Sequence, residues 1–475
     1  MAKYFTTTLP YVNADPHLGT ALEFVEADVL ARAARLRGEE VFFNTGTDEH
    51  GTKILQKAQE TGKDPQAYVD EYAARFKAFV DRLNISYSAF TRTTSPGHKA
   101  AAQAFWKRCE QAGDIYKAMY EVKYCIGCEL EKTDSELDNG RCVIHPHLEI
   151  QLIKEENYYF RFSKYQEPLL KLYAARPDFV VPDVRMNEIR SFVERGLKDF
   201  SISRRKEKLP WGVPVPGDDE HVMYVWFDAL VNYISVINWP REEGGFQKWW
   251  PGIQLAGKDN LRQQSAMWQA MLMSAGVAPS RQIFIHGFIN SGGQKMSKSL
   301  GNVIDPVALA DTYGVDAVRY LVLRHVHPFE DSDVTEEGLR EAYTANLVNG
   351  LGNLVARVMK LAEEHLPGPV VLTDEDMSVE DAFFKKVEAY RFNEAMDLIF
   401  EHIGKGDEYM TSTEPYKKIK DQSTKAEALA DIEKLVRHLA KVAAHLAPAM
   451  PATSEAILTT VRENKKPENL FPRLD

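Results

Sequence analysis

Cysteine is scarce in this chain, with four in 475 residues, and three of the four lie close together. That number and grouping exclude the disulfide framework of a small secreted domain. Apolar runs long enough to cross a membrane are also missing, as are internal repeats and low-complexity segments. The opening residues MAKYFTTT have neither a signal-peptide core nor a transit-peptide composition, so we expect a cytoplasmic protein.

Positive charge is not in excess, because the formal net charge is −11. This balance argues mildly against a nucleic-acid partner, since phosphate contacts need lysine and arginine. The argument is weak because only a local patch must be basic. Candidate patches lie at residues 203–208, 357–360 and 416–420, although a solvated helix or loop face explains each of them equally well.

The length favours two to four domains. Residues 1–114 alternate strands (4–9, 41–43) with amphipathic helices (18–37, 65–83), which predicts the first half of a doubly wound α/β core. Residues 115–216 break this pattern with short aromatic strands (116–124, 158–162) around a cysteine-bearing loop, which indicates an insertion. The α/β pattern resumes over residues 217–332, through 223–226, 254–256, a helix at 261–274 and a strand at 282–285.

Residues 333–475 are predicted to be helical. Apolar residues between 429 and 446 recur at helical spacing, so one stripe of a helix should face a core, and Pro448 and Pro451 should bend or end that helix. We expect a helix bundle at this end of the chain.

Two phosphate-handling signatures lie far apart, PHLGT at 16–20 and KMSKS at 295–299. The first follows a predicted strand, and Pro16 suits the first turn of the next helix. A helix start offers backbone N–H groups and a positive dipole end to an anion, His17 adds a donor, and Gly19 lets a nucleotide approach the backbone. Lysines on a glycine-bearing loop suit phosphate charge that develops in a transition state.

This pair of signatures resembles the hallmark motifs of the class I aminoacyl-tRNA synthetases. Within that class the chain is similar to the methionyl-tRNA synthetases over nearly its whole length, through LPYVN (9–13), GTDEHGT (46–52), DFSISR (199–204), YVWFDA (224–229), GKD (257–259) and HGF (286–288). The resemblance implies a Rossmann-type catalytic core in two halves (1–114 and 217–332), a connective-peptide insertion with a zinc knuckle (115–216) and a helical anticodon-binding domain (333–475).

The implied reaction joins L-methionine to tRNA(Met) through a methionyl adenylate, uses ATP with Mg²⁺, and releases pyrophosphate and AMP. No covalent side-chain nucleophile is needed, since catalysis rests on positioning and on stabilising phosphate charge. Because no room remains for the appended dimerisation domain of some members, we expect a monomer. Three other functions compete: a class I synthetase for another apolar amino acid, a synthetase-like binding protein that has lost catalysis, and a small related nucleotidyltransferase.

By resemblance, His17, Lys295 and Lys298 are the catalytic residues that contact phosphates. The full expected ATP set is His17, Gly19, Thr20, Gly257, Asp259, His286, Gly287, Phe288, Lys295 and Lys298. Thr20 stands where the common motif has a second histidine, and it donates one hydrogen bond but carries no charge. His17 and Asp259 could instead act as helix caps, and the two lysines as ordinary loop residues.

The expected methionine set is Leu9, Tyr11, Asp48, Arg204, Trp226, Ala229, Tyr233 and Gln264. Asp48 matches the acid that binds the ammonium group, and Arg204 matches the arginine that supports it or meets the carboxylate. Aromatic walls suit a polarizable thioether, although plain core packing would also explain Trp226 and Tyr233. Gln263 and Gln264 stand where many members have Phe-His, and a glutamine amide can still donate to the thioether sulfur.

The spacing Cys125-x2-Cys128-x13-Cys142-x2-His145 is a strong signature of a tetrahedral zinc site. Four protein ligands leave no open position, so one structural zinc ion is expected. A redox-active CxxC pair is the remaining alternative. Cys109 is left over and should be a core residue.

The tRNA anticodon is expected at Asn353 and Arg357, which lie one turn apart on one predicted helix, and at Tyr416. A tyrosine can stack on a splayed base. A solvated helix face is the alternative for Asn353 and Arg357.

Overall fold

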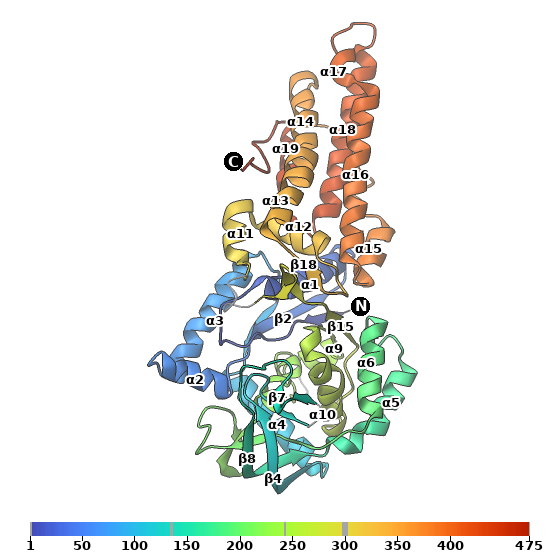
Figure 1. Cartoon of the computed structure of the whole chain (residues 1–475). Coiled ribbons are helices and arrows are strands. Elements are labelled where there is room, and N and C mark those ends of the chain that lie inside the picture. The colour runs from blue at the N-terminus through green and yellow to red at the C-terminus, as the bar shows by residue number, and fades with distance from the viewer. Residues whose placement is uncertain (1, 134–135, 242–243, 297–302, 475) are drawn as a thin grey trace. The chain divides into compact units, whose positions relative to one another are not determined.

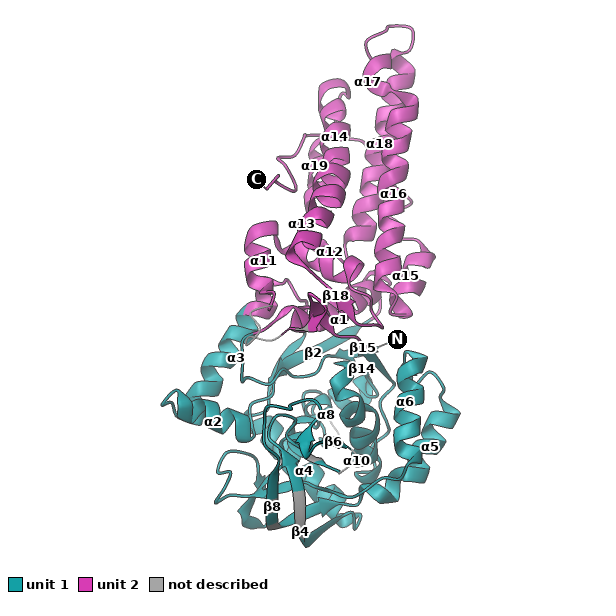
Figure 2. Cartoon of the chain, in the orientation of Figure 1, with its two compact units in different colours: residues 1–15, 40–78, 87–285 teal, residues 16–39, 79–86, 286–475 magenta. Residues whose placement is uncertain are grey.

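The structure is a computed structural model that describes residues 2–133, 136–241, 244–296 and 303–474 (Figure 1). The chain divides into two compact units (Figure 2). Unit 1 comprises residues 1–15, 40–78 and 87–285, and unit 2 comprises residues 16–39, 79–86 and 286–475. The four-domain division expected from the sequence is a finer one and stays a prediction.

Unit 1 is built on a six-stranded sheet with the order β3-β2-β1-β14-β15-β9. Its strands are β1 (Lys3–Thr6), β2 (Val41–Thr47), β3 (Ala89–Arg92), β9 (Val180–Val181), β14 (Ile253–Gly257) and β15 (Gln282–His286). The pairings β1–β2, β2–β3, β1–β14 and β9–β15 are parallel. This is the strand order of a Rossmann-type fold, in which the chain reverses its direction of growth between β1 and β14. The predicted fold class is therefore confirmed.

The helices of unit 1 bury apolar residues in two clusters, a large one that includes the fully buried Trp106, Trp268 and Phe105 and a small one that includes Ile54, Ala58 and Tyr68. They are α2 (Thr52–Glu60), α4 (Pro96–Gln111), α5 (Gln166–Ala175), α6 (Asp183–Glu194), α7 (Val225–Ala229), α8 (Asn232–Ser235), α9 (Gly245–Trp249) and α10 (Trp268–Ser274), with α3 (Pro65–Arg82) ending in unit 2. The helix expected over 261–274 is confirmed, and it contains a π-helical turn, Gln263–Met267, near its start. Such turns widen the helix locally and are frequent at functional sites.

The inserted segment forms its own small antiparallel sheets. The largest has the order β10-β8-β4-β5 and consists of β4 (Ile115–Cys125), β5 (Leu130–Lys132), β8 (Gln151–Phe160) and β10 (Phe200–Ser201). A two-stranded sheet of β6 (Leu137–Asp138) and β7 (Arg141–Cys142) lies within the cysteine-bearing loop. A third sheet contains β11 (Ser203–Arg205), β12 (Pro214–Val215) and β13 (Asp218–Met223). Residues 223–226, expected to resume the α/β pattern, run from the end of β13 into α7.

Unit 2 contains one early helix, α1 (Leu18–Leu36), and the C-terminal part of the chain. Its short strands are β16 (Ile289–Ser291), β17 (Gln294–Lys295) and β18 (Ser332–Asp333). Its later helices are α11 (Pro306–Tyr313), α12 (Val315–His325), α13 (Glu336–Ala342), the π-helical η6 (Tyr343–Gly352), α14 (Asn353–His365), α15 (Asp381–Glu388), α16 (Phe392–Thr413), α17 (Pro415–Lys418), α18 (Lys425–Leu446) and α19 (Pro451–Glu463).

The longest helices of unit 2, α16 and α18, lie side by side (Figure 1). The stripe predicted between residues 429 and 446 is confirmed, because Ile432, Leu435, Val436 and Leu439 are buried on α18. The helix ends at Leu446, and Pro451 opens α19 at a position where its missing N–H costs nothing. No helix in the described residues has the length and apolar character needed to cross a membrane.

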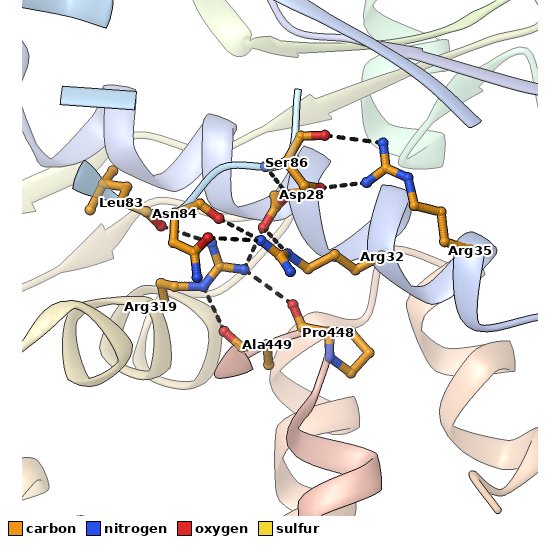
Figure 3. A network of polar contacts seen from close by, with 9 residues as sticks. All are labelled: Asp28, Arg32, Arg35, Leu83, Asn84, Ser86, Arg319, Pro448 and Ala449. Carbon is orange, nitrogen blue, oxygen red and sulfur yellow. Dashed lines mark hydrogen bonds and ion pairs between the residues drawn. The ribbon is translucent and has the colours of Figure 1, made fainter. Parts of the chain in front are cut away.

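A buried polar network joins α1 to α12 and to the break between α18 and α19 (Figure 3). Arg319 of α12 donates to the Asp28 carboxylate of α1 at 2.7 Å and to the Ala449 carbonyl at 2.7 Å. Arg32 also donates to Asp28, at 2.7 Å. Burial alone would raise the pKa of the Asp28 carboxyl, but Arg319 and Arg32 hold that pKa below its usual value.

Candidate amino-acid and nucleotide site

The carboxyl ends of β1, β2 and β14 carry the predicted site residues Leu9, Tyr11, Asp48, Gly257 and Asp259 of unit 1. The segment after β1 pairs with the segment after β2 through a bridge between Tyr11 and Asp48. The Asp48 N–H donates to the Pro10 carbonyl at 2.9 Å, and the Val12 N–H donates to the Asp48 carbonyl at 3.2 Å. Ligands of open α/β sheets bind at this edge, near the point where the strand order reverses.

Asp48 is 6% exposed and lies in a strongly acidic neighbourhood. Burial, followed by the fields of Asp228 and Glu129, raises the pKa of the Asp48 carboxyl well above its usual value. Thr93 donates to its carboxylate at 3.4 Å. A bound cation would offset the free-energy cost of burying the Asp48 charge and the repulsion between the carboxylates. This corner can therefore hold a primary ammonium group.

Asp228 is fully buried between two imidazoles. It accepts from His50 Nδ1 at 2.8 Å and from His98 Nε2 at 3.0 Å. Burial alone would raise the pKa of Asp228, but the two histidines lower it to about 2. The acidic neighbour of Asp48 is therefore fixed in place and ionised at neutral pH.

Arg204 on β11 is 8% exposed, and its guanidinium lies over the rings of Tyr124 and Tyr224, 5.1 and 4.6 Å from the ring centres. It donates to the Ser203 carbonyl at 2.7 Å and to the Ser201 hydroxyl at 2.8 Å. Stacking and backbone contacts of this kind hold a guanidinium rigidly. Arg204 thus presents a fixed positive charge in unit 1.

The predicted pocket residues Ala229, Tyr233 and Gln264 are buried, whereas Trp226 and Leu9 are half-buried. Gln264, on the π-helical turn, donates to the Tyr233 hydroxyl at 2.6 Å. The glutamine side chain therefore fixes the direction of the phenolic O–H. Core packing remains a sufficient explanation for the burial of Tyr233 alone, but it does not explain this hydrogen bond.

Unit 1 also holds two residues of the expected ATP set, Gly257 and Asp259. Gly257 ends β14, and Asp259 lies exposed in the short 3₁₀ turn Lys258–Asn260 that follows. The Asp259 carboxylate accepts from the Asn260 side chain at 3.4 Å. An exposed carboxylate at a strand's carboxyl end is accessible to ribose hydroxyls.

Unit 2 holds the remaining predicted ATP residues. His17 is the N-cap of α1, where its Nδ1 accepts from the Thr20 N–H at 3.3 Å, so the capping alternative describes its geometry here. Pro16 precedes this cap and is not in the first turn of the helix. A Cβ atom on Gly19 would lie 3.0 Å from the His17 ring, so glycine leaves that imidazole room.

His286 ends β15 and Gly287 follows it, and both are buried in unit 2, with Phe288 half-buried. His286 Nε2 lies 3.2 Å from the Glu23 carboxylate of α1. Burial alone would lower the pKa of His286, but Glu23 and Glu26 raise it to about 9. In the KMSKS segment, Lys295 ends β17, which pairs with β16, and Lys298 lies outside the described residues.

The three knuckle cysteines and His145 gather in the insertion, with one donor atom from each within 4.8 Å of the others. The Cys128 sulfur lies 3.5 Å from the Cys142 sulfur and 3.3 Å from His145 Nδ1, and the Cys125 sulfur lies 3.9 Å from His145 Nδ1. A Cβ atom on Gly127 would overlap the His145 ring. The four predicted ligands therefore form one cluster that could hold a metal ion.

The leftover Cys109 is buried in the core, as expected, and burial raises the pKa of its thiol to about 12.

A family model described as "tRNA synthetases class I (M)" matches residues 3–142 and 127–359. A methionine–tRNA ligase of Thermotoga maritima is 40% identical over 483 aligned residues, covering 98% of this chain and 76% of that protein. The chain belongs to the class I methionyl-tRNA synthetases.

Other comparisons agree with this family. A methionine–tRNA ligase of Thermosynechococcus vestitus is 43% identical over 479 residues, covering 96% of this chain and 90% of that protein. The structure of Mycobacterium tuberculosis methionyl-tRNA synthetase in complex with methionyl-adenylate superposes with a TM-score of 0.92, at 35% identity, over 99% of this chain and 100% of that one. The activity of the chain is that of a methionine–tRNA ligase.

The expected anticodon residues of this methionyl-tRNA synthetase lie in unit 2. Asn353 begins α14 and is exposed, and Arg357 lies one turn later, with an ion pair to Asp407 of α16 at 3.0 Å. Tyr416 lies in α17, and its side chain is 37% exposed. These side chains are accessible, as a contact with a nucleic-acid base requires.

Sequence reasoning missed four residues in the surroundings of Asp48: His50, His98, Asp228 and Glu129. His50 and Asp228 lie within the motifs GTDEHGT and YVWFDA, so the signal for these two was present in the sequence. His98 and Glu129 reach the site through contacts with residues that are far away in the sequence, and no local pattern predicts such contacts.

Proposed function

We propose that the chain activates methionine at the corner formed by Asp48, Tyr11 and Arg204. The observation that carries this assignment is the buried Asp48 carboxylate in an acidic neighbourhood, on the segment that is bridged to Tyr11. Asp48 binds the ammonium group, and Arg204 supplies a fixed positive charge for the carboxylate or for Asp48 itself. Leu9, Trp226, Ala229 and Tyr233 enclose the thioether. A related structure in complex with methionyl-adenylate supports this placement.

In the first step, a methionine carboxylate oxygen attacks the α-phosphorus of ATP, and the bond to the β-phosphate bridging oxygen breaks. Pyrophosphate takes the electron pair, and methionyl adenylate remains. His17, Lys295 and Lys298 stabilise the phosphate charge, with Gly19 and Thr20 at the helix start and Mg²⁺ on the nucleotide. Asp259 and Gly257 accept the ribose, and His286, Gly287 and Phe288 border the adenine. In the second step, a hydroxyl of the terminal tRNA adenosine attacks the acyl carbon and AMP leaves.

Pyrophosphate–ATP exchange with each of the twenty amino acids, without tRNA, tests this assignment. Exchange driven by methionine is the expected result, together with weak exchange by homocysteine, since one methyl group is worth only about 1–3 kcal/mol. Exchange driven by a different amino acid would show that Gln263 and Gln264 have re-specified the pocket. Absence of exchange with all of them would favour a binding protein without catalysis.

We further propose that the knuckle holds one structural zinc ion. In a tetrahedron with Zn–S bonds of about 2.3 Å, neighbouring ligand atoms lie about 3.8 Å apart. The ligand separations of 3.3 to 3.9 Å in the insertion fit such a tetrahedron. A bound zinc ion would crosslink the loop and leave no position for substrate. Elemental analysis should find about one zinc per chain, and a folded chain without zinc would refute the assignment.

The partner we propose is tRNA(Met), read at its anticodon by Asn353, Arg357 and Tyr416.

We propose that the protein acts in the cytoplasm as a monomer, for which sedimentation should give a single species near 53.9 kDa. A stable dimer would refute the monomer.

A further inference from the structure

Glu129 follows the second knuckle cysteine, yet its carboxylate is buried within the amino-acid corner of unit 1. Its side chain is 5% exposed. Its carboxylate accepts from the Tyr11 hydroxyl, at 3.0 Å to one oxygen and 3.2 Å to the other, and from the Lys53 N–H at 3.0 Å. The knuckle thus contacts the segments that follow both β1 and β2.

The bond to Lys53 replaces a missing helix cap. Helix α2 begins at Thr52, and its N-cap residue is Gly51, which has no side chain to accept from the first free N–H groups. Gly51 cannot be replaced by a capping residue, because its φ is +107° and a Cβ atom would overlap the Tyr11 hydroxyl. The Glu129 carboxylate therefore caps α2 from a distant segment, and it also suits the positive end of the helix dipole.

The backbone of Glu129 is held in an unusual conformation for this purpose. Its φ is +51°, in the left-handed region that a residue with a β-carbon rarely adopts. Its carbonyl accepts from the Tyr224 hydroxyl, and the Lys53 ammonium donates to the neighbouring Gly127 carbonyl at 2.5 Å. Strain of this kind persists where the surroundings fix it, and it is frequent at functional sites.

The segments that Glu129 joins are those that carry the methionine residues. Tyr11 belongs to the segment bridged to Asp48, and Gly51 lies three residues after Asp48. We propose that Glu129 is a positioning residue of the amino-acid site, which ties the Tyr11 hydroxyl and the start of α2 to the knuckle and so makes methionine affinity depend on the knuckle. This inference rests on the proposed methionine site. It assigns to Glu129 no contact with the substrate.

Substitutions at Glu129 test the proposal through the separate KM values for methionine and ATP in pyrophosphate exchange. Glu129→Gly keeps the left-handed backbone at low cost and removes the carboxylate together with the two methylene groups that carry it. We expect it to raise the methionine KM about tenfold or more and to leave the ATP KM unchanged. Glu129→Gln retains one acceptor oxygen and should recover part of the loss. The exposed knuckle variant Asp138→Asn is the matched control and should behave as wild type.

A double-mutant cycle tests the contact between Tyr11 and Glu129. Tyr11→Phe removes the hydroxyl that Glu129 accepts, so it should raise the methionine KM less in the Glu129→Gly background than in the wild type. Chelation of the knuckle metal should weaken methionine binding, measured by calorimetry without ATP, more in the wild type than in Glu129→Gly.

Three results would overturn the inference. One is a folded Glu129→Gly protein with the wild-type methionine KM. The second is full additivity in the Tyr11 cycle, which the Glu129→Asn background would also reveal if Glu129→Gly does not fold, because asparagine tolerates the left-handed backbone but has a shorter side chain. The third is a wild-type protein without methionine-dependent exchange, which would overturn the proposed function as well.

Discussion

The guanidinium of Arg319 donates to the carboxylate of Asp28 at 2.7 Å, and both side chains are completely buried. The same guanidinium donates to the carbonyls of Leu83, Pro448 and Ala449, at 3.1, 3.1 and 2.7 Å (Figure 3). One arginine therefore satisfies the buried acceptors of three segments of unit 2. A carboxylate left alone at this position would be strongly destabilising.

We expect Arg319→Met to lower the free energy of unfolding by about 3–5 kcal/mol, because it leaves the Asp28 charge and three carbonyls without this donor. The double variant with Asp28→Leu should cost less than the sum of the two single variants. Urea unfolding provides the measurement. The matched control is Arg462→Met, whose exposed pair with Glu455 should contribute no more than about 1 kcal/mol. Equal effects of the two substitutions would contradict this account.

Gln264 should control the use of methionine through Tyr233. Replacing it with leucine removes the donor that lies 2.6 Å from the Tyr233 hydroxyl. A drop in kcat/KM for methionine of about tenfold or more is expected, since a buried hydroxyl loses its partner. Gln264→His should retain most of the activity because an imidazole can donate from the same place. If leucine and histidine behave alike in pyrophosphate exchange, this role for Gln264 is wrong.

The buried Asp228 should make unfolding sensitive to acid. Its pKa is about 2 in the folded chain and about 3.9 in an unfolded one, so its stabilising contribution is present above pH 4 and is lost as the pH falls towards 2. The contribution is of the order of 2 kcal/mol. Asp228→Asn should flatten the dependence of unfolding free energy on pH between about 5 and 3. The exposed control Asp138→Asn should keep the wild-type slope, and a wild-type slope in Asp228→Asn would contradict the prediction.

The proposed anticodon contacts predict a loss in tRNA aminoacylation without a loss in pyrophosphate exchange. Arg357→Ala should lower the rate of tRNA aminoacylation at limiting tRNA by about tenfold or more, as the loss of a base contact does. It should leave methionine-dependent pyrophosphate exchange unchanged, since that reaction needs no tRNA. Lys360→Ala, an exposed change later on the same helix, is the matched control. Equal losses in both assays would indicate a folding defect in place of a tRNA contact.

Local patterns in the sequence predicted most of the fold because those elements are decided locally. The apolar stripe of α18 is buried as its spacing requires, and the strands after residues 40 and 281 begin where β-forming runs begin. The first strand ends at Thr6, earlier than its apolar run suggests, because residues 7–10 leave the sheet to approach the segment of Asp48. Helix α1 was expected to be amphipathic, yet it buries Glu23, Glu26 and Asp28, whose partners lie far along the chain.

The site residues also divide into those that a local motif predicts and those that only long-range contacts bring to the site. Tyr11 and Asp48 were predicted through motifs, and the structure brings their segments together at the sheet edge. Glu129 was not identified, because one acidic residue after a cysteine has no periodic or motif signal. Its role depends on a left-handed backbone and on contacts with residues 118 and 76 positions away.

The ion pair between Asp28 and Arg319 spans 291 positions of the chain. At about 5–20 residues per second, a ribosome needs roughly 15 to 60 s to make Arg319 after Asp28. Throughout that interval Asp28 has Arg32 of its own helix but lacks Arg319, and Pro448 and Ala449 are made later still. Unit 2 therefore cannot close around α1 until Ala449 has been made, whereas the segments of unit 1 are all available once residue 285 has emerged.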